Sequence, residues 1–191
     1  TSVFLHPTTR GGQIRTLEML KHLHKRHEIH YVALANPDEA EGPARASEYS
    51  TKAYPVAYRI ADKRSPKFFA QLVEGLLSPV PVVVFRKRSA TVKALISELV
   101  AREHFDSIVC DFLTPSINVP KLDNCVLFQH NVETMIWRRY EETSTHFIPR
   151  AYMRLQAARM FEYERRVCRS VSHVIAVSDV DAEMMRKMFE I

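Results

Sequence analysis

Short apolar runs alternate along the chain with stretches in which apolar side chains recur at helical spacing. The runs predict buried strands over residues 2–5, 29–35, 53–60, 107–112, 126–129 and 173–177. The periodic stretches predict helices over residues 14–26, 66–77, 91–104, 149–170 and 179–189. The run at 81–85 fits either a short strand or an extended lead into the next helix. Strands that alternate with helices predict a mostly parallel sheet with helices on both faces.

Length and composition favour one globular domain with this layering. The 191 residues, 46% hydrophobic and 26% charged, are enough for one sizeable core. We therefore expect a single Rossmann-like, three-layer α/β domain over residues 1–191. The chain starts without Met and stops inside a predicted helix, so we expect further sequence around it. No apolar run approaches the roughly 18–20 residues that cross a bilayer, and residues 1–7 do not resemble a signal peptide.

Cysteine usage and net charge narrow the compartment and the partners. Cys110, Cys125 and Cys168 are far apart in the sequence and form no C-x-x-C pair, which favours a reducing, cytoplasmic compartment. The formal charge of +5 indicates an anionic partner: nucleic acid, a nucleotide or a phospholipid surface. Charge alone does not choose among these three.

Polar side chains gather just past the ends of the predicted strands. Ligands of an open parallel sheet bind outside the carboxyl ends of its strands, so these side chains are the candidate substrate-binding residues. The candidate substrate-binding residues are Arg15, Asp111, Asn131, Glu133 and Ser178, together with the backbone of Gly11 and Gly12, and the candidate catalytic residue is His130. We expect all of them to share one rim of the sheet.

Two of these positions have a structural and a functional interpretation. Gly11 and Gly12 form a tight strand-to-helix turn, or they let the backbone of a helix N-terminus approach a phosphate. His130 is a structural histidine, or it donates to a substrate hydroxyl or transfers a proton. Local sequence leaves both pairs of alternatives open.

Metal and hydrolase chemistry find little support. Ser178 suits the N-cap of the last helix, and Asp179 and Asp181 suit its first turn better than a D-x-D metal site. The histidines between residues 22 and 30 span a helix end and a strand, which disfavours a zinc site, and we expect no metal and no cofactor. No G-x-S-x-G elbow accompanies Ser116, so hydrolysis is unsupported.

The predicted helix at 149–170 carries a row of arginines opposite an apolar stripe. The arginines are Arg150, Arg154, Arg159, Arg165, Arg166 and Arg169. Such a row forms a solvated basic face, contacts an anionic membrane surface, or binds RNA. No base-reading motif favours RNA.

Three motifs, taken in order along the chain, resemble one enzyme family. They are H-P-T-T-R-G-G-Q-I-R at 6–15, Q-H-N-V-E-T-M-I-W-R-R-Y at 129–140 and H-V-I-A-V-S-D at 173–179. Together they resemble the N-terminal, acceptor-side domain of a GT-B glycosyltransferase of family 4, the retaining, nucleotide-sugar-dependent group. The resemblance covers nearly the whole chain.

The resemblance implies roles for three residues. Gly11 and Gly12 match the family's glycine loop, which faces the donor diphosphate and the acceptor, and His130 matches the histidine near the transferred sugar. The family works without a bound metal, because backbone dipoles and basic residues stabilise the departing nucleoside diphosphate. The donor-binding C-terminal domain has no counterpart before Ile191, so we expect residues 1–191 alone to be inactive.

The expected partners are a nucleotide-sugar donor and a glycan or lipid-linked acceptor. An anionic membrane surface is compatible with them, which would place the enzyme in the cytoplasm at the inner membrane face, whereas we do not expect nucleic acid. Two alternatives are a GT-B sugar-nucleotide epimerase and a non-catalytic Rossmann-like module that binds nucleotide or RNA.

Overall fold

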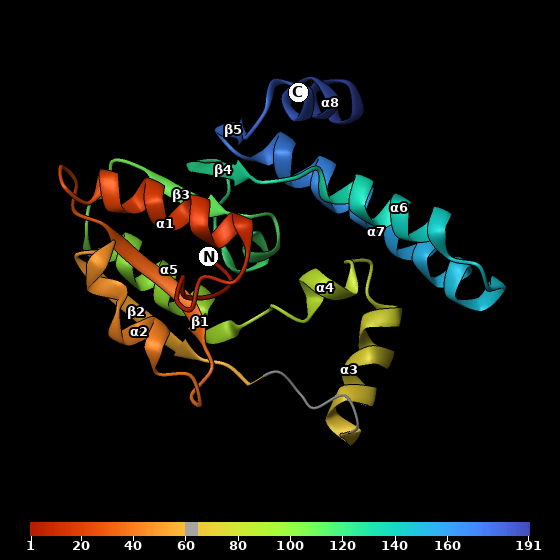
Figure 1. Ribbon diagram of the computed structural model, residues 1–191, viewed down its shortest axis with the longest axis horizontal. Helices are drawn as coiled ribbons and strands as arrows, with labels where there is room; N and C mark the ends of the chain where they lie inside the picture. Colours follow the sequence, from red (N-terminus) through yellow and green to blue (C-terminus); the bar gives the residue numbers. More distant parts are fainter. Residues whose placement is uncertain (60–64) are drawn as a thin grey trace. The chain divides into compact units, whose positions relative to one another are not determined.

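The computed structural model describes residues 1–59 and 65–191, which fall into two compact units (Figure 1). The first unit comprises residues 1–59 with Ser89–His104, and the second comprises residues 65–88 with Phe105–Ile191. Both units are α/β, and every strand pairing in the described residues is parallel. The predicted class of fold is therefore confirmed, although the strands lie in two sheets and the division into domains stays a prediction.

The first unit is built on two parallel strands. Its elements are α1 (Gly11–Leu23), β1 (His30–Ala35), α2 (Glu41–Ala44), the 3-10 helix η1 (Ala46–Glu48), β2 (Lys52–Ala57) and α5 (Ala90–Arg102). In the register of the pair, His30 lies opposite Lys52 and Ala35 opposite Ala57. One core cluster gathers around Tyr31 and Tyr49, and α5 adds Val92 to a second.

Residues 2–5 do not form the predicted strand. The segment is nevertheless packed, because Phe4 and Leu5 are buried. Hydrogen bonds to tyrosine side chains, rather than pairing with another strand, hold this segment in place. The Tyr31 hydroxyl donates to the Val3 carbonyl (2.9 Å), and the Leu5 amide donates to the Tyr49 hydroxyl (3.4 Å). Phe4 also fills the space beside Gly42, where an added Cβ would lie 2.6 Å from the Phe4 Cβ. Apolar content correctly indicated burial here but not strand pairing.

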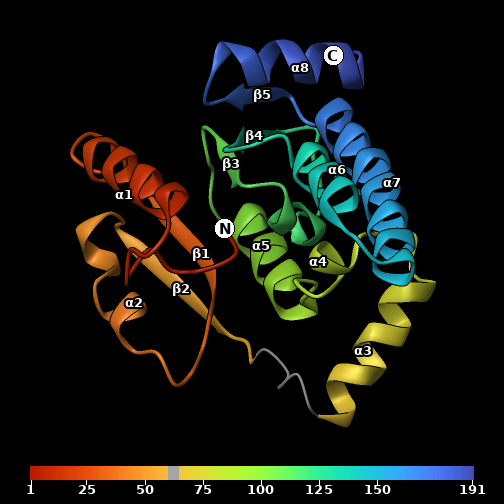
Figure 2. The ribbon, with the colours of Figure 1, turned by 45° about the vertical axis from the view of Figure 1, so that its right-hand side comes forward.

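The second unit has a three-stranded sheet in the order β3-β4-β5. Its elements are α3 (Pro66–Leu77), α4 (Val82–Phe85), β3 (Ile108–Asp111), the 3-10 helix η2 (Thr114–Asn118), β4 (Cys125–Gln129), α6 (Glu133–Thr143), α7 (Phe147–Ser170), β5 (His173–Ala176) and α8 (Asp179–Phe189). Helices α6 and α7 run side by side as a hairpin in both ribbon views (Figure 2). The core joins the sheet to α7 and α8 through Leu127, Met160, Val167 and Phe189.

Most predicted elements are present, and the differences have local causes. The ambiguous run at 81–85 forms the short helix α4. Helix α7 begins at Phe147 rather than 149, since Pro149 in its first turn needs no helical hydrogen bond from its nitrogen. Helix α6 was not predicted. Residue 60, which ends the predicted strand 53–60, lies outside the described residues.

In residues 1–59 and 65–191, no helix combines enough length with enough apolar character to cross a bilayer.

Candidate functional site

The carboxyl ends of β3 and β4 bring Asp111 and His130 into direct contact. Asp111 ends β3, His130 follows β4, and the register places Asp111 beside Phe128 on the neighbouring strand. The His130 Nε2 lies 2.8 Å from the Asp111 Oδ1. Both residues are buried, with 4% of His130 and 7% of Asp111 exposed. The adjacent strand ends thus form a buried histidine–carboxylate pair. The His130 ring is more enclosed than we expected for a residue on an open rim of the sheet.

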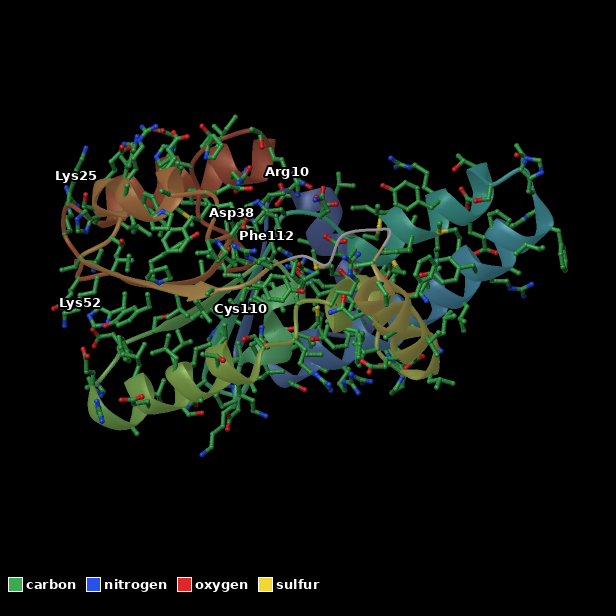
Figure 3. The ribbon with its side chains drawn as sticks, turned by 90° about the horizontal axis from the view of Figure 1, so that it is seen from below. Arg10, Lys25, Asp38, Lys52, Cys110 and Phe112 are labelled. Atoms are coloured by element: carbon green, nitrogen blue, oxygen red, sulfur yellow. The ribbon has the colours of Figure 1, made fainter. Side chains whose placement is uncertain are left out.

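Two aromatic rings fix the imidazole from other directions. The Phe112 ring stacks on it with centroids 3.9 Å apart and planes 14° apart, and Phe128 meets it edge-on at 4.6 Å. Phe112, which is labelled in Figure 3, comes directly after β3, and its φ of 68° lies in the left-handed region. Residues with large side chains rarely adopt this backbone conformation. Here it occurs at the residue whose ring stacks on His130.

Phe112 offers a test of this strained stacking. We expect Phe112→Gly to have a higher free energy of unfolding than Phe112→Ala, by about 1 kcal/mol. Both variants lose the ring, but only glycine adopts a positive φ without a steric penalty. Urea unfolding of the two variants measures the difference. A more stable alanine variant would contradict the left-handed conformation at this position.

A buried carboxylate holds the segment that carries His130. Glu164 of α7 is fully buried and accepts four hydrogen bonds from residues on both sides of His130. The donors are the Gln129 Nε2 (2.8 Å), the Glu133 amide (2.9 Å), the Thr134 amide (2.7 Å) and the Thr134 hydroxyl (2.6 Å). Val132, the N-cap residue of α6, makes no capping hydrogen bond with its side chain. Glu164 on the neighbouring helix instead accepts from the first amides of α6.

Burial shapes the titration of this cluster. It raises the pKa of Glu164 to about 7, although the hydrogen bonds from Thr134 and Glu133 oppose the rise. Burial also raises the pKa of Glu133. Sequence reasoning missed Glu164. A signal was present, because Glu164 falls at helical spacing between Met160 and Cys168, on the apolar stripe of α7.

The remaining predicted residues of this unit lie near the same strand ends. Asn131 is exposed and directly follows His130. Ser178 is the N-cap of α8: its hydroxyl accepts from the Asp181 amide at 3.1 Å and donates to the Asp181 carboxylate at 2.7 Å. The helix-start interpretation of Ser178 is thereby confirmed, and its contact with a substrate stays a prediction.

Gly11, Gly12 and Arg15 belong to the first unit. Helix α1 begins at Gly11, so the two glycines form its first turn rather than a loop before it. Arg10, at the start of α1 in Figure 3, is an N-cap whose side chain does not cap the helix. A Cβ added to Gly11 would meet nothing within 4 Å, so packing does not require glycine there. That these residues share one rim with His130 stays a prediction.

The sequence was also compared with known families and proteins. Residues 9–191 match the family model described as Glycosyltransferase Family 4. This chain belongs to glycosyltransferase family 4. Neither the curated proteins nor the solved structures gave a match. The parallel α/β architecture agrees with a Rossmann-like N-terminal domain of this family.

Three arginines of α7 in this family 4 domain have hydrogen-bond or ion-pair partners within the second unit. Arg159 donates to the Gly75 and Leu76 carbonyls at the end of α3 (3.0 and 2.6 Å). Arg165 pairs with Glu162, and Arg169 pairs with Glu190. Arg159, Arg165 and Arg169 are therefore tied to neighbouring groups of the protein, so these three are not free cations. Where the structure describes the chain, no three His, Cys, Asp or Glu side chains are grouped to hold a metal ion.

Proposed function

We propose that this domain is the acceptor side of a retaining GT-B glycosyltransferase, which transfers a sugar from a nucleotide-sugar donor to a glycan or lipid-linked acceptor. The membership in glycosyltransferase family 4 over residues 9–191 carries the proposal. The His130–Asp111 pair at the carboxyl ends of β3 and β4 supports it, because ligands of parallel sheets bind at that edge.

His130 is the residue that we place next to the transferred sugar. Asp111 and Phe112 hold its ring in one orientation, so little reorganisation is needed when charge develops in the transition state. The exposed Asn131 offers an amide donor and acceptor to sugar hydroxyls beside it. Glu133 and Ser178 are the other proposed contacts on this side.

The donor diphosphate is proposed to lie at the N-terminus of α1. Helix amides and the helix dipole favour an anion there, and the absent side chain of Gly11 leaves room for it. Arg15 adds a positive charge one turn further on. We propose that these groups and the donor-binding domain act without a resident metal or cofactor.

A donor screen tests the proposed function. The full-length enzyme is incubated with uridine-, guanosine- and adenosine-diphosphate sugars, with and without lipid-linked or glycan acceptors. We expect release of nucleoside diphosphate that depends on the acceptor. An altered sugar nucleotide formed without any acceptor would instead identify an epimerase. Residues 1–191 alone are expected to transfer no sugar, and turnover by them would contradict the acceptor-side role.

We also propose that the second unit docks on an anionic membrane, which suits a lipid-linked acceptor. Large apolar side chains are exposed at the start of α7 and on α3. Phe147 and Ile148 are 84% and 79% exposed, and Leu77 is 83% exposed. Arg150 and Arg154, on the first turns of α7, are exposed and have no ion-pair partner among the described residues. Apolar side chains beside unpaired arginines suit the interface of an anionic bilayer.

Vesicle sedimentation tests the docking surface. We expect binding to phosphatidylglycerol vesicles and little binding to phosphatidylcholine vesicles. Replacing Phe147 and Ile148 together by serine should weaken the binding by about tenfold, since two exposed apolar side chains that would enter the bilayer interface are lost. Val180→Ser is the matched control, because Val180 is an exposed apolar residue (71%) on α8. Equal losses in both variants would contradict a specific docking surface.

A further inference from the structure

The segment from Gln129 to Thr134 is held at both ends by one side chain. Gln129 precedes His130 and donates to the Glu164 Oε1, which also accepts from the Glu133 amide. The Thr134 amide and hydroxyl both donate to the Glu164 Oε2. The two carboxylate oxygens therefore connect the end of β4 to the first turn of α6, across the residues that present His130 and Asn131.

The strength of this connection comes from charge and burial. Hydrogen bonds to an ionised carboxylate are roughly twice as strong as neutral ones. The amides that donate are the first two of α6, where the helix dipole also favours a negative charge. Glu164, Thr134 and Gln129 are all at most 1% exposed, so water does not compete for these bonds. Removing the acceptor would leave buried donors unsatisfied.

We propose that Glu164 is a positioning residue of the His130 site: its carboxylate fixes the segment 129–134 and thereby places His130 and Asn131 for the reaction. The inference rests on the proposed function, because that function gives His130 its role. Glu164 does not contact the substrate in this scheme. Asp111 and Phe112 orient the imidazole, whereas Glu164 sets the path of the backbone that carries it.

The charged and titratable groups around Glu164 come from two helices. Glu133 of α6 and Cys168 of α7 lie close enough to interact with it, and burial raises the pKa of both. Thr134 and Gln129 contribute only neutral donors. Experiments on Glu164 are therefore best made at about pH 8, where its carboxylate is ionised.

The test uses Glu164→Gln in the full-length enzyme, with Glu162→Gln as the matched control. Glutamine keeps the shape of the side chain but turns one acceptor oxygen into a donor group that faces other donors. Glu162 lies on the same helix and is exposed, with Arg165 as its partner. Two readouts are compared: hydrogen exchange of the Glu133 and Thr134 amides, and kcat and KM for a sugar nucleotide that the unaltered enzyme turns over.

In Glu164→Gln, we expect the two amides to exchange roughly tenfold faster and kcat to fall about tenfold, while KM for the donor stays within about twofold. Glu162→Gln should change neither readout. Faster exchange with an unchanged kcat would overturn the positioning role and leave a structural cap. Unchanged exchange would overturn the connection itself. Normal turnover by His130→Ala would refute the role of His130 and with it the positioning role of Glu164. The hydrogen-exchange data would still show whether Glu164 caps α6.

Discussion

Replacing His130 by alanine in the full-length enzyme is expected to lower kcat by roughly a hundredfold to a thousandfold. The imidazole is held by Asp111 at 2.8 Å and by the stacked ring of Phe112. Such preorganisation helps only if the ring interacts with the transition state more strongly than with the bound substrate. Steady-state kinetics with the donor found in the screen measures the change, which should appear in kcat more than in KM.

Another histidine whose side chain is enclosed supplies the control for this substitution. The side chain of His30 is 6% exposed and lies 3.1 Å from a Glu28 oxygen, so it shares burial and a carboxylate partner with His130. It begins β1, at the amino end of that strand, away from the strand ends where ligands bind. We expect His30→Ala to keep kcat within about twofold once folded. An equal loss in both variants would point to stability rather than catalysis.

Replacing Glu164 by alanine is expected to lower the free energy of unfolding by about 3 kcal/mol. Four donors lose their shared acceptor, and a fully buried side chain is truncated next to the core of α6 and α7. Glu162→Ala, on the exposed side of the same helix, should change it by less than about 0.5 kcal/mol. Urea unfolding measures both variants, and equal losses would contradict the capping role of Glu164.

The same residue predicts a pH dependence with a definite sign. The pKa of Glu164 is about 7 in the folded protein against an ordinary value of 4.5, so the folded state holds a proton that the unfolded state releases. The part of the stability that Glu164 contributes through its raised pKa is therefore complete below about pH 4.5 and is lost as the pH rises through about 7, whereas its four hydrogen bonds remain.

Comparison with Glu164→Gln isolates this titration, because the other groups titrate in both proteins. The difference in free energy of unfolding between the unaltered protein and the variant should fall by on the order of 3 kcal/mol between pH 4.5 and 8. The charge of the neighbouring Glu133 also raises the pKa of Glu164, so it acts in the same direction as burial. A difference that stays constant with pH would mean that Glu164 is ionised throughout.

Regular patterns in the sequence were sufficient to predict the helices and strands whose apolar periodicity is strong. Helix α8 occupies the predicted residues 179–189, since Ser178 caps it and Met185 and Phe189 mark its buried face. Helix α6 shows the opposite case. Its apolar residues Met135, Ile136 and Trp137 are adjacent rather than spaced along one face, so its pattern is weak, and its first turn depends on a cap from α7.

The candidate site divides in the same way. Strand ends are read from sequence, so Asp111 and His130 could be named, because carboxyl ends of neighbouring parallel strands meet at one edge. Their direct contact and the stacking of Phe112 depend on register and on one backbone angle, which local sequence does not specify. Ser178 was assigned to a helix start from sequence, and its hydrogen bonds agree.

The sequence by itself determined the α/β class, the order of its main strands and helices, and the family 4 motifs, since these depend on periodicity and short-range spacing. Only the tertiary structure decided that Glu164 supports the His130 segment. Residues 129–134 and Glu164 are about thirty positions apart, and their hydrogen bonds exist only because α6 packs against α7. The sequence shows only that Glu164 lies on an apolar stripe. Its role as a hydrogen-bond acceptor can be recognised once the folded chain places the donors of Gln129 and Thr134 beside it.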